Sequence, residues 1–238
     1  MLEKFKGRYF EKKFLAGLAA KKRVLFLTTS NRWSGGDKDD KPKSTRLAEI
    51  LADKAGRDKV EIIDVPSLNI YPCEGNVSAA AGNNCGAIKA LLKDKTKNPS
   101  GCHRCWASVN NQDDELWKIS RPLLESDCVV FFASVRWGQA NACYQKLLER
   151  LTWLENRHVS LGEDNILKNI SAGVVLVGHN WRADKVLDVH KQVLKFFGFR
   201  VAKELCWSWQ YTHDAFDESN SGYRADRLEF FKMLKNLK

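Results

Sequence analysis

The chain has 238 residues, 44% of them hydrophobic, and its 39 lysines and arginines exceed its 29 aspartates and glutamates. This length and apolar content are enough for a full hydrophobic core, and they fit one domain with insertions better than two separate domains. The net charge of +10 favours an anionic partner, namely a phosphate-bearing ligand, a nucleic acid or a membrane surface. No apolar stretch approaches the length of a membrane span.

The first 21 residues form a basic leader that we expect to precede the main domain at residues 22–238. Residues 1–23 carry eight lysines or arginines against two glutamates, so part of the net charge belongs to this leader. Its apolar residues recur at roughly helical spacing, at Leu2, Phe5, Tyr9, Phe14 and Leu18. The pattern predicts an amphipathic helix, for which docking on the domain is favoured over a position on a membrane surface.

Strands and helices alternate along the first part of the chain. Residues 23–28 form a short apolar run that predicts a buried strand, and residues 60–65 predict a second one. Between them a helix is predicted at residues 44–55, with Leu47, Ile50 and Leu51 on its inner face and Gly56 at its end. About residues 66–112 contain three prolines and no regular pattern, which indicates an insertion.

The alternation resumes after the insertion. Asp113, Asp114 and Glu115 predict the start of a helix that runs to residue 126 with a kink at Pro122, because carboxylates suit the positive end of a helix. Residues 128–132 are continuously apolar and predict a third buried strand. The next helix is indicated by an apolar stripe at Ala140, Cys143, Tyr144, Leu147, Leu148, Leu151 and Leu154.

The last part of the chain predicts a strand at residues 172–177, a helix at 184–197, a fifth strand at 199–207 and a closing helix at 224–237. Five strands separated by helices predict an α/β fold with a mostly parallel, doubly wound sheet in three layers and right-handed crossovers. Open sheets of this kind bind ligands at the carboxyl ends of their strands. We therefore expect a ligand site where the loops after the first and third strands meet.

The loop after the first strand offers hydroxyl groups for a phosphate. A Gly-x-Gly-x-x-Gly turn and a glycine-led Gly-Lys-Ser/Thr loop are both missing, which argues against the common dinucleotide and nucleoside-triphosphate sites. Instead Ser30 and Arg32 lie in the loop, and Ser44, Thr45 and Arg46 open the next helix. Hydroxyls and N–H groups at a helix N-terminus bind a terminal phosphate, and a guanidinium neutralises it. The alternative is that Ser44 only caps the helix and the remaining loop is solvated.

The loop after the third strand suits a flat ring. It is predicted to contain Ser134, Val135, Arg136, Trp137 and Gly138. Backbone N–H groups between a strand end and a helix start are unpaired, so they can bond a polar heteroaromatic ring. Arg136 has the alternative of a surface ion pair, and Trp137 that of core packing. A phosphate loop beside a ring loop is what flavin mononucleotide (FMN) requires.

From residue 23 to about residue 205 the chain resembles the flavodoxin-like NAD(P)H-dependent FMN reductases and quinone reductases. The phosphate loop of that family reads Ser-x-Arg, a short spacer and Ser/Asn-Thr. It is matched here by Ser30-Asn31-Arg32 and Ser44-Thr45, with an enlarged spacer.

The flavin loop of the family reads Ser-Pro-Val-Tyr-Trp-Gly and precedes a helix that ends in Asp-Arg. Residues 133–138 and Glu149-Arg150 match these motifs, but Ser134 replaces the proline and Arg136 replaces the tyrosine. If the resemblance holds, Arg136 puts a cation near the ring. A further ring-contacting loop of the family corresponds to Gly178, His179 and Asn180.

The resemblance implies a flavodoxin-like sheet of strand order 2-1-3-4-5, bound FMN, and a homodimer or higher homo-oligomer whose partner chain helps to wall the flavin. The expected activity passes electrons from NAD(P)H through FMN to a small acceptor, such as a quinone, a flavin or a nitro compound. Because the cofactor performs this chemistry, no catalytic acid or base and no metal ligand is assigned.

Three alternatives remain open. A flavodoxin-type electron carrier would use the same loops without a nicotinamide site. An iron–sulfur flavoprotein would use the insertion cysteines Cys73, Cys85, Cys102 and Cys105, although only the last two have the spacing of a ligand pair. A flavin-free regulatory or nucleic-acid-binding module would use the basic leader. The total of seven cysteines is odd and no export signal is recognisable, which predicts reduced thiols in the cytoplasm.

Overall fold

The computed structural model describes residues 2–31, 41–75, 84–178, 182–210, 228 and 230–236, and it describes residues 2–8 by their backbone alone. In chain order the elements are α1 (Leu2–Leu18), β1 (Val24–Thr28), α2 (Lys43–Ala55), β2 (Val60–Asp64), η1 (Val65–Ser67), η2 (Ile88–Ala90), α3 (Trp106–Asn110), α4 (Trp117–Glu125), β3 (Cys128–Arg136), β4 (Gln139–Ala140), α5 (Ala142–Val159), β5 (Ser171–Gly178), α6 (Ala183–Phe196), β6 (Arg200–Val201), η3 (Lys203–Leu205) and β7 (Trp207–Gln210).

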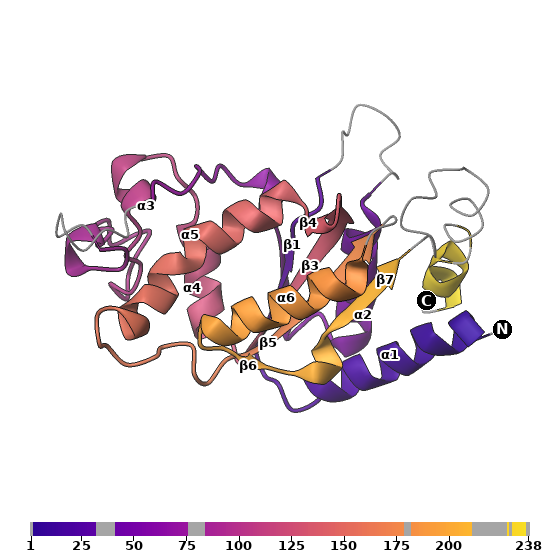
Figure 1. The fold of residues 1–238 in the computed structure, drawn as a ribbon. Coiled ribbons are helices and arrows are strands. Elements are labelled where there is room, and N and C mark those ends of the chain that lie inside the picture. The colour runs from indigo at the N-terminus through magenta and orange to yellow at the C-terminus, as the bar shows by residue number, and fades with distance from the viewer. Residues whose placement is uncertain are drawn as a thin grey trace.

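Helices cover both faces of one sheet (Figure 1). Its order is β2-β1-β3-β5-β6, with β7 also paired to β5 and β4 paired to the end of β3. The pairs among β1, β2, β3, β5, β6 and β7 are parallel, whereas β4 runs antiparallel to β3. The predicted parallel α/β fold is confirmed. The sheet has seven strands instead of five, and its order differs slightly because β4 is added and the last predicted strand is divided.

The central strands bury both of their faces. In β3, Val129 and Phe131 belong to the core under α4, α5 and α6, whereas Val130 and Phe132 belong to the core under α1, α2 and residues 230–236. Successive side chains of a strand point to opposite faces, so a strand covered on both sides needs apolar residues at every position. This is why the sequence of β3 is a continuous apolar run.

Helix α1 is docked on the sheet. The Phe10 ring stacks on the Trp207 ring of β7, with centroids 4.3 Å apart, and Phe14 and Leu18 are fully buried. Of the two alternatives for the basic leader, the structure therefore shows the docked helix. Within the described part of the chain, none of the helices combines the length and the apolar character needed to cross a membrane.

Helix boundaries agree with the sequence where an apolar stripe is present. α2 and α6 each begin one residue before their predicted ranges, and Tyr144, Leu147, Leu151 and Leu154 of the stripe in α5 are buried. Gly56 follows α2 with a φ of +107°, a conformation that glycine adopts without a Cβ penalty. Of the predicted closing helix, residues 228 and 230–236 are helical, and the remainder lies outside the described residues.

The strand predicted at residues 199–207 is interrupted. β6 and β7 both pair with β5, but η3 lies between them. Leu205 of η3 packs directly against Gly173 of β5, where an added Cβ would lie 2.4 Å from both the Cβ and the carbonyl oxygen of Leu205. The prediction of one continuous strand is therefore wrong, because the chain leaves the ladder here and crosses closely over Gly173.

Replacing Gly173 with alanine is expected to lower the free energy of unfolding by about 3 kcal/mol, because the added methyl group overlaps backbone atoms that have no room to move. Urea denaturation followed by tryptophan fluorescence measures this loss. Gly75→Ala is the control, since a Cβ there meets nothing within 4 Å and only the φ of +64° is unfavourable. Its expected cost is about 1 kcal/mol. Equal losses in the two variants would contradict the close approach of Leu205.

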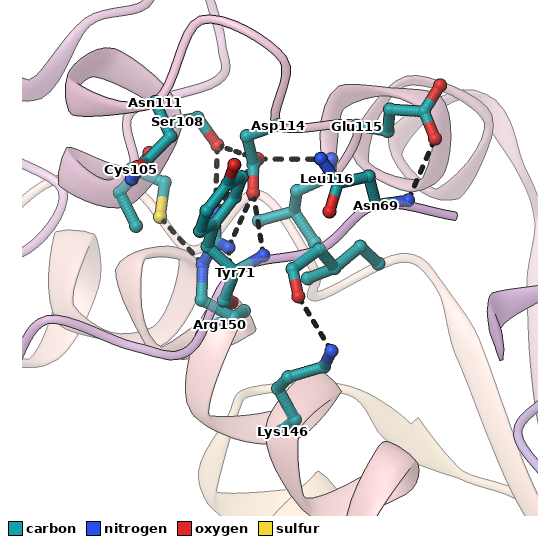
Figure 2. Close-up of polar contacts among 12 residues, drawn as sticks. Asn69, Tyr71, Cys105, Ser108, Asn111, Asp114, Glu115, Leu116, Lys146 and Arg150 are labelled. Atoms are coloured by element: carbon teal, nitrogen blue, oxygen red, sulfur yellow. Dashed lines mark hydrogen bonds and ion pairs between the residues drawn. The ribbon is translucent and has the colours of Figure 1, made fainter. Parts of the chain in front are cut away.

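Arg150 of α5 forms a buried ion pair with Asp114, which directly follows the insertion, and is hydrogen-bonded to residues of the insertion (Figure 2). The side chains of Arg150 and Asp114 are fully buried, and Nη1 and Nη2 of Arg150 donate to the Asp114 carboxylate at 2.7 and 2.9 Å. Arg150 also donates to the Tyr71 carbonyl at 2.7 Å, to Ser108 Oγ at 2.9 Å and to Cys105 Sγ at 3.4 Å. These five bonds use every N–H of the guanidinium, so its charge is buried without an unpaired donor.

The position of Asp114 corrects the prediction for the helix before β3. That helix is α4, and it begins at Trp117 rather than at residue 113. Asp114 precedes the helix and accepts hydrogen bonds from the backbone N–H groups of Tyr71 and Leu116, besides those from Arg150. Its carboxylate is therefore neutralised by a guanidinium on α5 instead of by the dipole of its own helix.

Candidate functional site

The carboxyl ends of β1 and β3 form the topological switch point of the sheet (Figure 1). β1 lies between β2 and β3, and all three run parallel. The helix that follows β1, α2, covers one face of the sheet, and the helix that follows β3, α5, covers the other. Open α/β sheets bind ligands where the connections diverge in this way. The two sequence motifs flank this point.

The loop after β1 and the first turn of α2 are together called the phosphate side. Here the structure brings Ser30 and Ser44 together. Their Oγ atoms lie 2.6 Å apart, and both residues are buried. This hydrogen bond joins the loop after β1 to the first turn of α2. The alternative that Ser44 caps the helix is wrong, because the N-cap is Pro42 and no side chain caps this helix end.

The neighbouring hydroxyl, that of Thr45, is left without a partner. Its Oγ1 atom is buried and receives no hydrogen bond from any group in the described residues. The first N–H groups of a helix also have no acceptor within the helix. An anion at this place would satisfy both kinds of group, and Arg46, half-buried in the same turn, carries the opposite charge. The residues around the start of α2 therefore fit a phosphate group.

The end of β3 and β4, with the turn between them, are called the ring side. The loop predicted here is largely a hairpin. β3 continues to Arg136, turns through Trp137 and Gly138, and returns as β4, with Arg136 opposite Gln139. Both turn residues have positive φ, 51° and 68°, as the favoured two-residue hairpin turn requires. The prediction of an open loop from residue 134 to residue 138 is therefore wrong. Only Trp137 and Gly138 lie outside the ladder.

The side chains of this hairpin differ in exposure. Trp137 is 73% exposed at the tip, so its alternative role in core packing is wrong. Arg136 is exposed and forms no ion pair with a described residue, which removes the support for its surface-pair alternative. Val135 is buried, and its backbone pairs with β5 on one side and β4 on the other. Ser134 is half-buried.

Gly178 ends β5 beside this hairpin. It pairs with Val135, and an added Cβ would lie 2.5 Å from the Cβ of Val135, so sheet packing alone requires glycine here. The remaining predicted site residues, Arg32, His179 and Asn180, lie outside the described residues.

Sequence reasoning missed Asn141, the N-cap residue of α5. Its Nδ2 donates to the Thr29 carbonyl at 2.6 Å, and its Oδ1 accepts the Ser134 N–H at 3.1 Å. Thr29 directly follows β1 and Ser134 lies in β3, so one buried amide connects the two sides of the switch point. An asparagine before a helix predicts a cap, and no sequence pattern indicates these distant partners.

The insertion cysteines form no metal site in the described residues. No group of three or more histidine, cysteine, aspartate or glutamate side chains there is arranged to hold a metal ion. Cys85 and Cys105 are buried, and Cys73 and Cys102 are half-buried. Burial and the nearby Cys105 raise the pKa of the Cys85 thiol to about 12, which keeps it protonated at neutral pH. Thiolates are the form that binds metals.

Comparison with known proteins shows the fold. No protein-family model and no curated protein matches this sequence. Among solved structures, RosB with bound 8-demethyl-8-formylriboflavin-5'-phosphate superposes with a TM-score of 0.57 at 14% identity, over 90% of this chain and 75% of RosB. An azoreductase from Bacillus anthracis superposes with a TM-score of 0.52 at 14% identity, over 90% of this chain and 98% of the azoreductase.

This chain has a flavodoxin-like fold. The expectation drawn from the sequence resemblance is confirmed at this level. Within the fold, Ser30 and Ser44 lie at the switch point between β1 and β3, where open α/β sheets bind ligands.

Proposed function

We propose that this protein binds FMN at the carboxyl edge of its sheet and passes electrons from NAD(P)H to a small acceptor, such as a quinone, a flavin or a nitro compound. The observation that carries the proposal is the buried Ser30–Ser44 pair, beside the unpartnered Thr45 hydroxyl, at the start of α2. A flavin phosphate is also the ligand named for RosB, which shares the fold.

The phosphate of FMN would bind at the start of α2. One proton of the Ser30–Ser44 pair lies between the two oxygens, so the other serine proton, the Thr45 hydroxyl and the first N–H groups of the helix would donate to the phosphate oxygens, and Arg46 would offset its charge. A hydrogen bond to a charged group contributes about 1.5 to 3 kcal/mol, so two hydroxyl donors and the helix N–H groups would bind this end of the cofactor firmly.

The ring of FMN would lie against the hairpin of β3 and β4 and the end of β5. Bound FMN supplies a ring that accepts a hydride and returns electrons. The protein would contribute position and charge, and Arg136 is the cationic residue of the hairpin. A homodimer or higher homo-oligomer, whose second chain walls the ring, is part of the proposal, and analytical ultracentrifugation tests it.

Titration with FMN tests the cofactor site. Wild-type protein is expected to quench FMN fluorescence on binding and to bind riboflavin, which has no phosphate, more weakly. Ser44→Ala is expected to weaken FMN binding at least about tenfold, because it removes one bond to the phosphate, and to leave riboflavin binding unchanged. Ser120→Ala is the matched control, since Ser120 is a buried serine of α4 that hydrogen-bonds His103. Wild-type protein that binds no FMN would overturn the proposal.

Stopped-flow mixing distinguishes the enzyme from an electron carrier. NADPH or NADH is expected to bleach the absorbance of the bound flavin within seconds, and a quinone is expected to restore it. A carrier of the flavodoxin type would bind FMN equally well but respond only slowly to either nicotinamide. Slow bleaching together with tight FMN binding would therefore support FMN as the cofactor and contradict the proposed enzymatic activity.

A further inference from the structure

We propose that Asn141 is a positioning residue that holds the phosphate side and the ring side of the site in one fixed arrangement. The inference rests on the proposed function, since it concerns how the two ends of FMN are bound together. In this role Asn141 fixes the two half-sites relative to each other, so that binding of the phosphate favours binding of the ring.

The contacts of Asn141 span the two strands. Its Nδ2 donates to the Thr29 carbonyl at 2.6 Å, and its Oδ1 accepts from the Ser134 N–H at 3.1 Å and from Thr29 Oγ1 at 3.2 Å. Its backbone N–H donates to the Ser134 carbonyl at 2.9 Å. Asn141 is 8% exposed, so these bonds form out of contact with most of the solvent and are costly to leave unmade.

The side chain of Asn141 does not serve its own helix. It occupies the N-cap position of α5, yet it makes no capping hydrogen bond there. Its hydrogen bonds are made instead to Thr29, just after β1, and to Ser134 of β3. The ordinary interpretation of an asparagine at a helix start, that it caps the helix, is therefore excluded.

The hydrogen bonds of Asn141 lie just beyond the point where the pairing of β1 with β3 ends. The register between β1 and β3 ends at Thr28 opposite Phe132. Beyond it the Thr29 N–H still donates to the Phe132 carbonyl at 2.9 Å, and the single proton of Thr29 Oγ1 is shared between that carbonyl, at 3.1 Å, and Asn141 Oδ1. Ser30, which follows Thr29, begins the phosphate side, and Ser134 begins the ring side. Asn141 joins these two sides beyond the end of the β1–β3 ladder.

A rigid connection between two half-sites raises the affinity for a ligand that occupies both. When the phosphate is bound, a fixed arrangement presents the ring side at the correct distance, and the second contact costs little further entropy. A loose connection loses this gain even though every direct contact to the ligand is still available. The phosphate then adds less to the affinity for the whole cofactor.

The test compares FMN with riboflavin. The ratio of the dissociation constant of riboflavin to that of FMN measures what the phosphate contributes, and fluorescence titration gives both constants. Asn141→Ala is expected to lower this ratio about tenfold, the equivalent of one lost buried hydrogen-bond connection. A variant that was merely less stable would weaken both ligands alike and leave the ratio unchanged.

Asn98→Ala is the matched control. Asn98 is a buried asparagine of the insertion, and its side chain, like that of Asn141, makes three hydrogen bonds: two from Nδ2 to the carbonyls of Leu92 and His103 and one from the His103 N–H to its Oδ1. Its loss is expected to lower stability similarly and to leave the ratio at the wild-type value.

Asn141→Asp provides a second variant of the same shape. The carboxylate keeps the acceptor for Ser134 but loses the donor to the Thr29 carbonyl, so the ratio is expected to fall at neutral pH. Because a protonated carboxyl can donate again, lowering the pH is expected to return the ratio toward that of wild-type protein at the same pH. A wild-type ratio in both Asn141 variants would overturn this inference alone. Wild-type protein that binds neither flavin would overturn the proposed function and this inference with it.

Discussion

Replacing Arg150 with methionine is expected to lower the free energy of unfolding by about 3 to 5 kcal/mol, the cost of leaving one charge of a buried pair alone. The Asp114 carboxylate would remain fully buried and lose two of its hydrogen bonds. Urea denaturation followed by fluorescence from the eight tryptophans measures the change. We expect the loss to be accompanied by faster proteolysis within the insertion, because Arg150 also holds the Tyr71 carbonyl and Ser108.

The matched control for this prediction is Arg121→Met. Arg121 lies on the surface of α4 and pairs with Glu125 at 3.3 Å, with both side chains about half exposed. Exposed pairs contribute about 0 to 1 kcal/mol, so this variant is expected to remain close to wild type. Similar losses in the Arg150 and Arg121 variants would show that the buried pair is not a principal anchor of the insertion.

The pH dependence of the Arg150 variant follows from the carboxyl group. Burial acts to raise the pKa of Asp114, but the bonds from Arg150 and Ser108 and the charge of Arg150 outweigh burial and lower the pKa. In wild-type protein this group therefore stabilises the fold above its unfolded pKa, and the contribution is lost as the pH falls through the folded pKa. Without Arg150 the effect of burial is no longer outweighed by a guanidinium, so the pKa of Asp114 is expected to rise. The difference in stability between variant and wild type is thus expected to shrink in acid.

This anchor also shows where prediction from the sequence ended. Asp114 and Arg150 are 36 residues apart and belong to different elements. Locally, three acidic residues before an amphipathic stretch favour a helix N-terminus, and only the tertiary partner identifies Asp114 as buried. The observed bounds of elements such as β1, α2 and β5 lie close to the predicted ones. The apolar pattern that identifies each of these elements lies within its own sequence. Their apolar runs and stripes are caused by burial on both sides of the sheet.

The candidate site was predictable in part for the same reason. Hydroxyls at the start of α2 indicate a phosphate because helix N-termini bind anions wherever they occur, and the structure does bring Ser30 to Ser44. The hairpin after β3 was not predictable, because it depends on Trp137 adopting positive φ, which non-glycine residues rarely do. The role of Asn141 was also hidden, since its partners are fixed only when β1 and β3 become neighbours.

The protein is expected to lose stability as the pH falls from 6.5 toward 4, in part because of two buried histidines. His103 and His190 are each 3% exposed, and burial lowers the pKa of each from 6.5 to about 4. Nδ1 of His103 is hydrogen-bonded to Ser120 Oγ at 2.9 Å. The His190 ring packs edge-on against the Tyr144 ring, with ring centroids 4.8 Å apart. In the described part of the chain, His103 Nε2 and His190 Nδ1 are buried without a hydrogen-bond partner, so a proton added at either atom would have no acceptor there.

The sign of the effect follows from proton binding. Between pH 6.5 and about 4 the unfolded chain binds a proton at each of these histidines and the folded protein does not. The stabilisation is therefore complete above the unfolded pKa and is lost as the pH falls to the folded pKa, by about 3 kcal/mol for each histidine. His190→Phe keeps an aromatic ring against Tyr144 and removes the titrating group. The free energy of unfolding is measured near pH 7 and near pH 4 in both proteins. The difference between the two proteins removes the contribution of the carboxyl groups, which they share. The variant is expected to lose about 3 kcal/mol less than wild type across this range, and an equal loss would mean that His190 accepts a proton without leaving its site.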